Sequence, residues 1–131
     1  DIKKIENLYL TDNNNISNGN LASINKLRKL GHLNTHGIDI GIIPESICEL
    51  YFLSSINIEN SKTLIFPDCI SEMRSLIFID AVNCNLTEVP KAFYKSQSIE
   101  GINLKGNKIT SLPKELNQNT LLILMRFLQD A

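Results

Sequence analysis

Several features that mark common classes of protein are missing from this sequence. Basic residues are not in excess, since 13 Lys and Arg face 14 Asp and Glu. This balance excludes the broad electrostatic footprint of a nucleic-acid-binding protein. No apolar run reaches the about 20 residues that a membrane helix needs, so we expect no membrane insertion. The opening Asp-Ile-Lys-Lys-Ile-Glu-Asn has neither Met nor an apolar signal region, so we expect that a leader was removed or never present.

Cysteine is also scarce. The 3 cysteines, Cys48, Cys69 and Cys84, cannot all pair within one chain, and no two of them have CxxC spacing. We therefore expect neither a disulfide framework nor a zinc knuckle. Low cysteine content suits a reducing cytoplasm, but it suits many bacterial secreted proteins equally well.

Motifs of catalysis are missing as well. The chain has no Gly-rich phosphate loop, no HExxH and no GxSxG. Cys84 falls in a column of expected core residues, where a nucleophilic role is disfavoured. We expect a protein that is not an enzyme and that uses no cofactor and no metal.

What the sequence does have is a regular period. Its 131 residues are 43% hydrophobic and 21% charged, which suits a single domain over residues 1–131 with a buried core. Its 4 prolines, Pro44, Pro67, Pro90 and Pro113, follow one another at steps of 23 residues. A fixed period between about 20 and 50 residues is typical of a solenoid.

Aligning the chain on these prolines brings apolar residues into columns. The first column holds Leu30, Leu53, Leu76, Ile99 and Leu122, and the next, three residues later, holds Leu33, Ile56, Ile79, Ile102 and Met125. Further apolar residues follow at alternate positions within each unit, and this is the period of a strand with one buried face. Residues 99–113 show the pattern best and read IEGINLKGNKITSLP.

This pattern resembles the leucine-rich repeat, LxxLxLxxN/CxL, over residues 5–128. The resemblance implies an α/β solenoid, a curved horseshoe with a parallel sheet of about six strands on the concave face and short helices or helical turns on the convex face. Its units would span residues 5–29, 30–52, 53–75, 76–98 and 99–121, with a partial unit at 122–131. Units of this length with Leu-Pro at the corner are similar to those of surface or secreted proteins of pathogenic bacteria, spirochaetes among them, and to those of cytoplasmic scaffolds.

Local features refine this expectation. Residues 21–27 form the longest convex segment and predict an α-helix. An Asn at the ninth position of a unit, such as Asn107, is expected to bond to buried backbone groups at the end of a strand. Ile38 occupies that position in the second unit, so we expect an irregular turn there, helped by Gly37 and Gly41.

The C-terminal segment 121–128 fits a sixth strand in register, and it also has a helical stripe. We favour the strand. An apolar sheet edge at that end invites pairing with another chain. We therefore expect either that the natural protein continues or that this edge forms a homodimer.

Residues that point outward from the strands of such a scaffold are rigid and free of packing duty, so they are the candidate binding residues. Aromatic residues and Arg concentrate binding energy at interfaces, which singles out Tyr9, Phe78 and Arg126 among these candidates. His36 and Glu59, on neighbouring strands, are expected to form an exposed ion pair. The full candidate set is Tyr9, Asn34, His36, Asn57, Glu59, Phe78, Asp80, Asn103, Lys105 and Arg126.

These observations predict a protein-binding module that uses the concave sheet face. The resemblance favours a secreted or surface protein of a bacterium that meets host proteins, with a role in virulence. The alternatives are a cytoplasmic scaffold with the same surface and a structural segment of a larger solenoid with no partner of its own.

Overall fold

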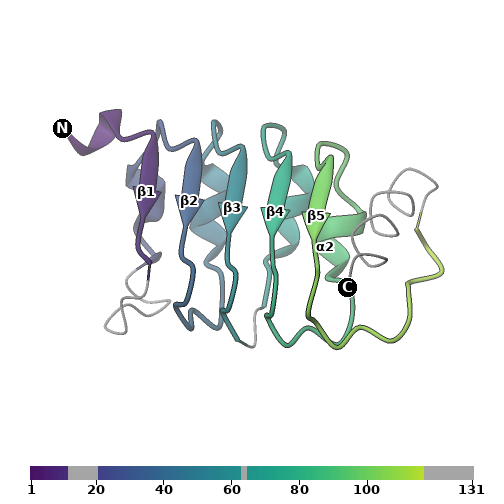
Figure 1. Ribbon diagram of the computed structural model, residues 1–131. Coiled ribbons are helices and arrows are strands. Elements are labelled where there is room, and N and C mark those ends of the chain that lie inside the picture. Colours follow the sequence, from purple (N-terminus) through teal and green to yellow (C-terminus); the bar gives the residue numbers. More distant parts are fainter. Residues whose placement is uncertain (12–20, 63–64, 117–131) are drawn as a thin grey trace.

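The structure is a computed structural model that describes residues 1–11, 21–62 and 65–116. Its fold is α/β, built on a parallel sheet of 5 strands that follow one another in chain order (Figure 1). The strands are β1 (Asn7–Tyr9), β2 (His32–Asn34), β3 (Ser55–Asn57), β4 (Phe78–Asp80) and β5 (Gly101–Asn103). The sixth strand expected in segment 121–128 lies outside the described residues.

Neighbouring strands pair in the register that the aligned columns predict. Leu33 pairs with Ile56, and Ile56 pairs with Ile79, at steps of 23 residues. These central residues and their counterpart in β5, Ile102, are at most 4% exposed. In β2, β3 and β4 only this central residue is buried, so the residues on either side of it point to the opposite face of the sheet.

Helical segments cover one face of the sheet and leave the other face open (Figure 1). They are η2 (Ile24–Lys26), η3 (Glu45–Glu49), η4 (Asp68–Glu72) and α2 (Lys91–Tyr94), and η1 (Ile2–Lys4) precedes the first strand. Pro44, Pro67 and Pro90 each stand directly before one of these helices, where a missing backbone N–H is not needed. Among the described residues, no helix has the length and apolar character to cross a membrane.

The convex segment of the first unit differs from its prediction. Instead of an α-helix over 21–27, Ile24–Lys26 form the 3-10 helix η2. Leu21 and Ile24 are both buried at a spacing of three residues. A three-residue spacing matches the 3-10 helix, in which residues i and i+3 lie above one another, so this short segment buries both side chains without an α-helix.

An asparagine side chain provides hydrogen-bond partners for backbone groups near the ends of the strands, as expected. The Asn107 Oδ1 accepts the N–H groups of Cys84 (2.9 Å) and Leu86 (3.0 Å), while its Nδ2 donates to two backbone carbonyls. In the second unit, Gly37 (φ 75°) is left-handed, as are the equivalent residues Asn60, Asn83 and Gly106 of the later units, so this conformation is a regular feature of the units. Gly41 (φ 74°) is a further left-handed residue in the second unit. The prediction for Asn107 is therefore confirmed, whereas the irregular turn is supported by Gly41 and not by Gly37.

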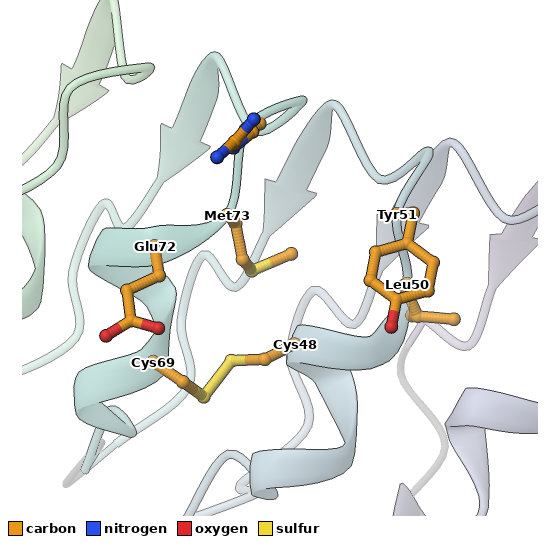
Figure 2. Close-up of a pocket in the computed structure, with 7 residues that line it drawn as sticks. Cys48, Leu50, Tyr51, Cys69, Glu72 and Met73 are labelled. Carbon is orange, nitrogen blue, oxygen red and sulfur yellow. A yellow bond between two sulfur atoms is a disulfide. The ribbon is translucent and has the colours of Figure 1, made fainter.

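The cysteines depart from their prediction, because Cys48 of η3 and Cys69 of η4 form a disulfide with a Cα–Cα distance of 6.1 Å (Figure 2). The two residues are 21 positions apart, close to the spacing of neighbouring strands. This separation places them on adjacent helices of the covered face. Cys84 remains a free, buried thiol.

Candidate functional site

The open face of the sheet brings five of the ten predicted binding residues together. A hollow of about 230 Å³ lies on it between strands β1 and β4. Polar and aromatic side chains of four strands line this hollow, together with two central core residues. The lining comprises Tyr9, His32, Leu33, Asn34, Ser55, Ile56, Asn57, Phe78 and Asp80.

Two aromatic residues bound the hollow. Tyr9 is 67% exposed on β1, and Phe78 is half-buried on β4. These strands are separated by β2 and β3, so the two backbones lie about 14 Å apart at the usual strand spacing. Most of the residues that line the hollow between them are polar.

Asn34, Asn57 and Asn103 occupy equivalent positions of β2, β3 and β5, called here the asparagine column, and they have a structural role that the sequence did not reveal. Asn34, Asn57 and Asn103 each use Oδ1 to accept the backbone N–H two residues later, at 3.0 to 3.2 Å. This pattern is an Asx turn, which holds the chain as it leaves the strand. Because the N–H must face an oxygen, the network also assigns the amide orientation. Among the described residues, the Nδ2 groups of these three side chains have no hydrogen-bond partner, so the column presents donors to a ligand.

Asp80 occupies the same column in β4 and makes the same turn. Its Oδ1 accepts the Val82 N–H at 3.3 Å. Burial raises the pKa of the Asp80 carboxyl above its ordinary value, although the hydrogen bond from Val82 opposes this effect. Smaller contributions come from the Glu59 carboxylate, which raises the pKa, and from His36, which lowers it. Among the described residues of this column, Asp80 is therefore the one that brings a charge to the open face.

The remaining charged candidates lie beyond the hollow, at the ends of the strands. His36 Nδ1 and Glu59 Oε2 are 3.4 Å apart, with 33% and 32% of their side chains exposed, so the predicted contact is present between partly buried side chains. Asn60 Nδ2 approaches His36 Nε2 at 3.5 Å. Lys105 is exposed after β5. The carboxylates of Asp80 and Glu59 are thus neighbours, and Glu59 already has His36 as a partner.

One contact in the hollow was not anticipated from the sequence. His32 Nδ1 and Ser55 Oγ lie 2.6 Å apart across β2 and β3. The two residues are direct partners in the sheet, as their spacing of 23 residues indicates. This hydrogen bond fixes the imidazole in the floor, and the sheet register is the signal from which it could have been found.

The free cysteine lies in the core of the protein. The Cys84 thiol lies within 3.0 Å of the Ile58 carbonyl, and burial is the main cause that raises its pKa to about 11. A thiol of that kind is a poor nucleophile at neutral pH. Within residues 1–11, 21–62 and 65–116, no group of three or more His, Cys, Asp or Glu side chains is placed to hold a metal ion.

A second, larger hollow of about 390 Å³ lies beside the disulfide, on the side of the helices (Figure 2). Leu50 and Met73 contribute its buried apolar wall, and Tyr51 stands at its margin with 76% of its surface exposed. Glu72 and Arg74 are its charged lining residues. Apolar surface makes up a larger share of this hollow than of the hollow on the open face.

Arg126, the last predicted binding residue, lies outside the described residues, as does the C-terminal edge expected to form a homodimer. Neither a scan against protein-family models nor a search of curated proteins finds a match to this chain. The candidate site therefore rests on its own geometry.

Proposed function

We propose that this chain is a leucine-rich repeat solenoid that binds a partner protein through the open face of its sheet. The hollow between Tyr9 and Phe78 is the observation that carries this function. It combines exposed aromatic surface with unpaired amide donors and one carboxylate, all on rigid strands. Interfaces concentrate their binding energy on aromatic side chains in such settings, with polar groups setting orientation.

The solenoid is supported by the spacing of the strands. Successive strands β2 to β5 pair at steps of 23 residues, with equivalent residues buried in each. A solenoid of this kind stacks short units so that each covers the apolar face of the next. The parallel sheet with helical segments on one side is the arrangement that the resemblance implies.

A secreted or cell-surface location belongs to the same proposal. Its support is the disulfide between Cys48 and Cys69, because disulfides persist in oxidising compartments and are rare in the cytosol. A bacterial origin and a role in virulence, with host proteins as the partners, rest on the resemblance of the sequence alone.

The test compares two aromatic pairs of identical composition. The immobilised protein captures partners from host extracellular proteins and, separately, from bacterial lysate. One variant carries Tyr9→Ala and Phe78→Ala on the open face. The matched control carries Tyr51→Ala and Phe52→Ala, which remove aromatic side chains that are 76% and 63% exposed away from the strands.

We expect a partner that the native protein and the control retain and the open-face variant loses, with all three proteins folded by circular dichroism. A partner lost only by the control would move the binding site to the helical side. Equal capture by all three proteins would place the binding surface away from both aromatic pairs, and no capture would favour the structural-segment alternative.

A further inference from the structure

The negative charge of Asp80 is not needed by the fold. In β2, β3 and β5, the same position is occupied by Asn34, Asn57 and Asn103, and each makes the same hydrogen bond to the backbone two residues later. An amide therefore does this structural work three times within the described sheet. Asp80 does it with a carboxylate instead, so its charge requires a separate explanation.

That charge is also unfavourable where it lies. Half-burial on the open face disfavours the ionised form of Asp80, and the neighbouring Glu59 adds to the effect. Among the described residues, no Lys, Arg or His forms an ion pair with Asp80, and its Oδ2 has no hydrogen-bond partner. A charge that costs stability and lacks a partner in its own chain is typical of a binding site.

The surroundings of Asp80 indicate which cation fits. Phe78 is two residues earlier on the same strand, so its ring leaves from the same face about 7 Å away. Both side chains line the hollow on the open face. An arginine guanidinium stacks on an aromatic face and simultaneously forms parallel hydrogen bonds to a carboxylate, whereas a lysine ammonium is compact and strongly hydrated.

We propose that Asp80 and Phe78 form a pocket for an arginine side chain of the partner protein. The guanidinium stacks against the Phe78 ring and donates to the unpaired Oδ2 of Asp80. The Nδ2 donors of Asn57 and Asn34 lie beside this pocket and suit the backbone carbonyls of the same partner segment. This assignment rests on the proposed protein-binding function and adds the chemistry that the site selects.

The experiment uses small probes, so that it does not depend on identifying the partner. The isotope-labelled protein is titrated with N-acetyl-arginine amide and followed by NMR. N-acetyl-citrulline amide is the neutral probe of nearly the same shape, and N-acetyl-lysine amide is the compact cation. The Val82 amide reports directly on Asp80, because it donates to the carboxylate.

We expect a saturable shift of the Val82 amide with the arginine probe, a weaker effect with lysine and none with citrulline. Asp80→Asn should weaken arginine binding at least about tenfold and still fold, since Asn makes the same turn in three neighbouring strands. Glu72→Gln, which removes one carboxylate from the helical side, should leave arginine binding unchanged.

Equal shifts with arginine and citrulline, equal affinity for lysine, or full binding by Asp80→Asn would overturn the guanidinium pocket. Failure of the arginine pocket can be distinguished from failure of the proposed protein-binding function. A partner that requires Tyr9 and Phe78 but binds equally to Asp80→Asn would overturn the arginine assignment and leave the binding function intact. Arginine binding without any captured protein would overturn the binding function instead.

Discussion

Removal of the disulfide should weaken the fold by an amount that follows from its position. The double variant Cys48→Ala/Cys69→Ala opens a loop closed by residues 21 positions apart. Cross-linking such a loop lowers the entropy of the unfolded chain, and the chain-entropy relation gives about 3 kcal/mol at 25 °C. The cross-link also joins η3 to η4, so its loss affects two neighbouring parts of the helical layer.

Urea unfolding followed by circular dichroism measures this loss. For a domain of this size, about 3 kcal/mol corresponds to a midpoint lower by about 1 to 3 M urea. Reductant should lower the midpoint of the native protein to that of the double variant, and it should not affect the variant itself. Alkylation of the unfolded, unreduced protein should modify Cys84 alone, since it is the one free cysteine.

Two results would refute this reasoning. Modification of all 3 cysteines without reductant would show that the bond is absent. Coincident unfolding curves for the native protein and the double variant would show that the cross-link does not stabilise the fold.

Three further perturbations test the core, the strand ends and the charge on the open face. Ile79→Ala should lower the free energy of unfolding by about 2 to 5 kcal/mol, because the side chain is 1% exposed; a loss near zero in urea unfolding would contradict its place in the core. Asn107→Ala removes four hydrogen bonds to backbone groups and should lower the free energy of unfolding by about 2 to 3 kcal/mol, with a loss below about 0.5 kcal/mol contradicting the structural role. Asp80→Asn should raise stability at neutral pH, because the folded protein raises the pKa of this carboxyl and so disfavours its ionised form. The gain should vanish below the ordinary pKa of aspartate and grow as the pH rises through the higher pKa of the folded state; a gain largest in acid would have the wrong sign.

The sheet register could be predicted from the sequence because burial imposes it. Leu33, Ile56 and Ile79 must all point to one side, so a slip by one residue would expose them. The same alignment placed His36 beside Glu59, and their side chains lie 3.4 Å apart. Roles that follow from a residue's position on a strand could therefore be predicted from the sequence.

Features that depend on side-chain geometry could not be predicted from the sequence. Cys48 and Cys69 are 21 residues apart rather than 23, so they occupy different positions of their units and meet only because η3 and η4 lie side by side. The alignment likewise shows that Asn34 and Asn57 point outward, but not that each Oδ1 already bonds to its own backbone. Short-range hydrogen bonds of this kind depend on the turn after each strand, which a column of residues does not describe.

The open face is tested most directly by the dissociation constant of a captured protein, measured by titration calorimetry with the native chain and the two aromatic variants. Hot-spot aromatic residues each contribute at least about 2 kcal/mol, and 1.4 kcal/mol corresponds to tenfold in affinity. We therefore predict that Tyr9→Ala/Phe78→Ala weakens binding about 100-fold or more, whereas Tyr51→Ala/Phe52→Ala leaves it within about threefold. Equal affinities for the native chain and the open-face variant would contradict the account.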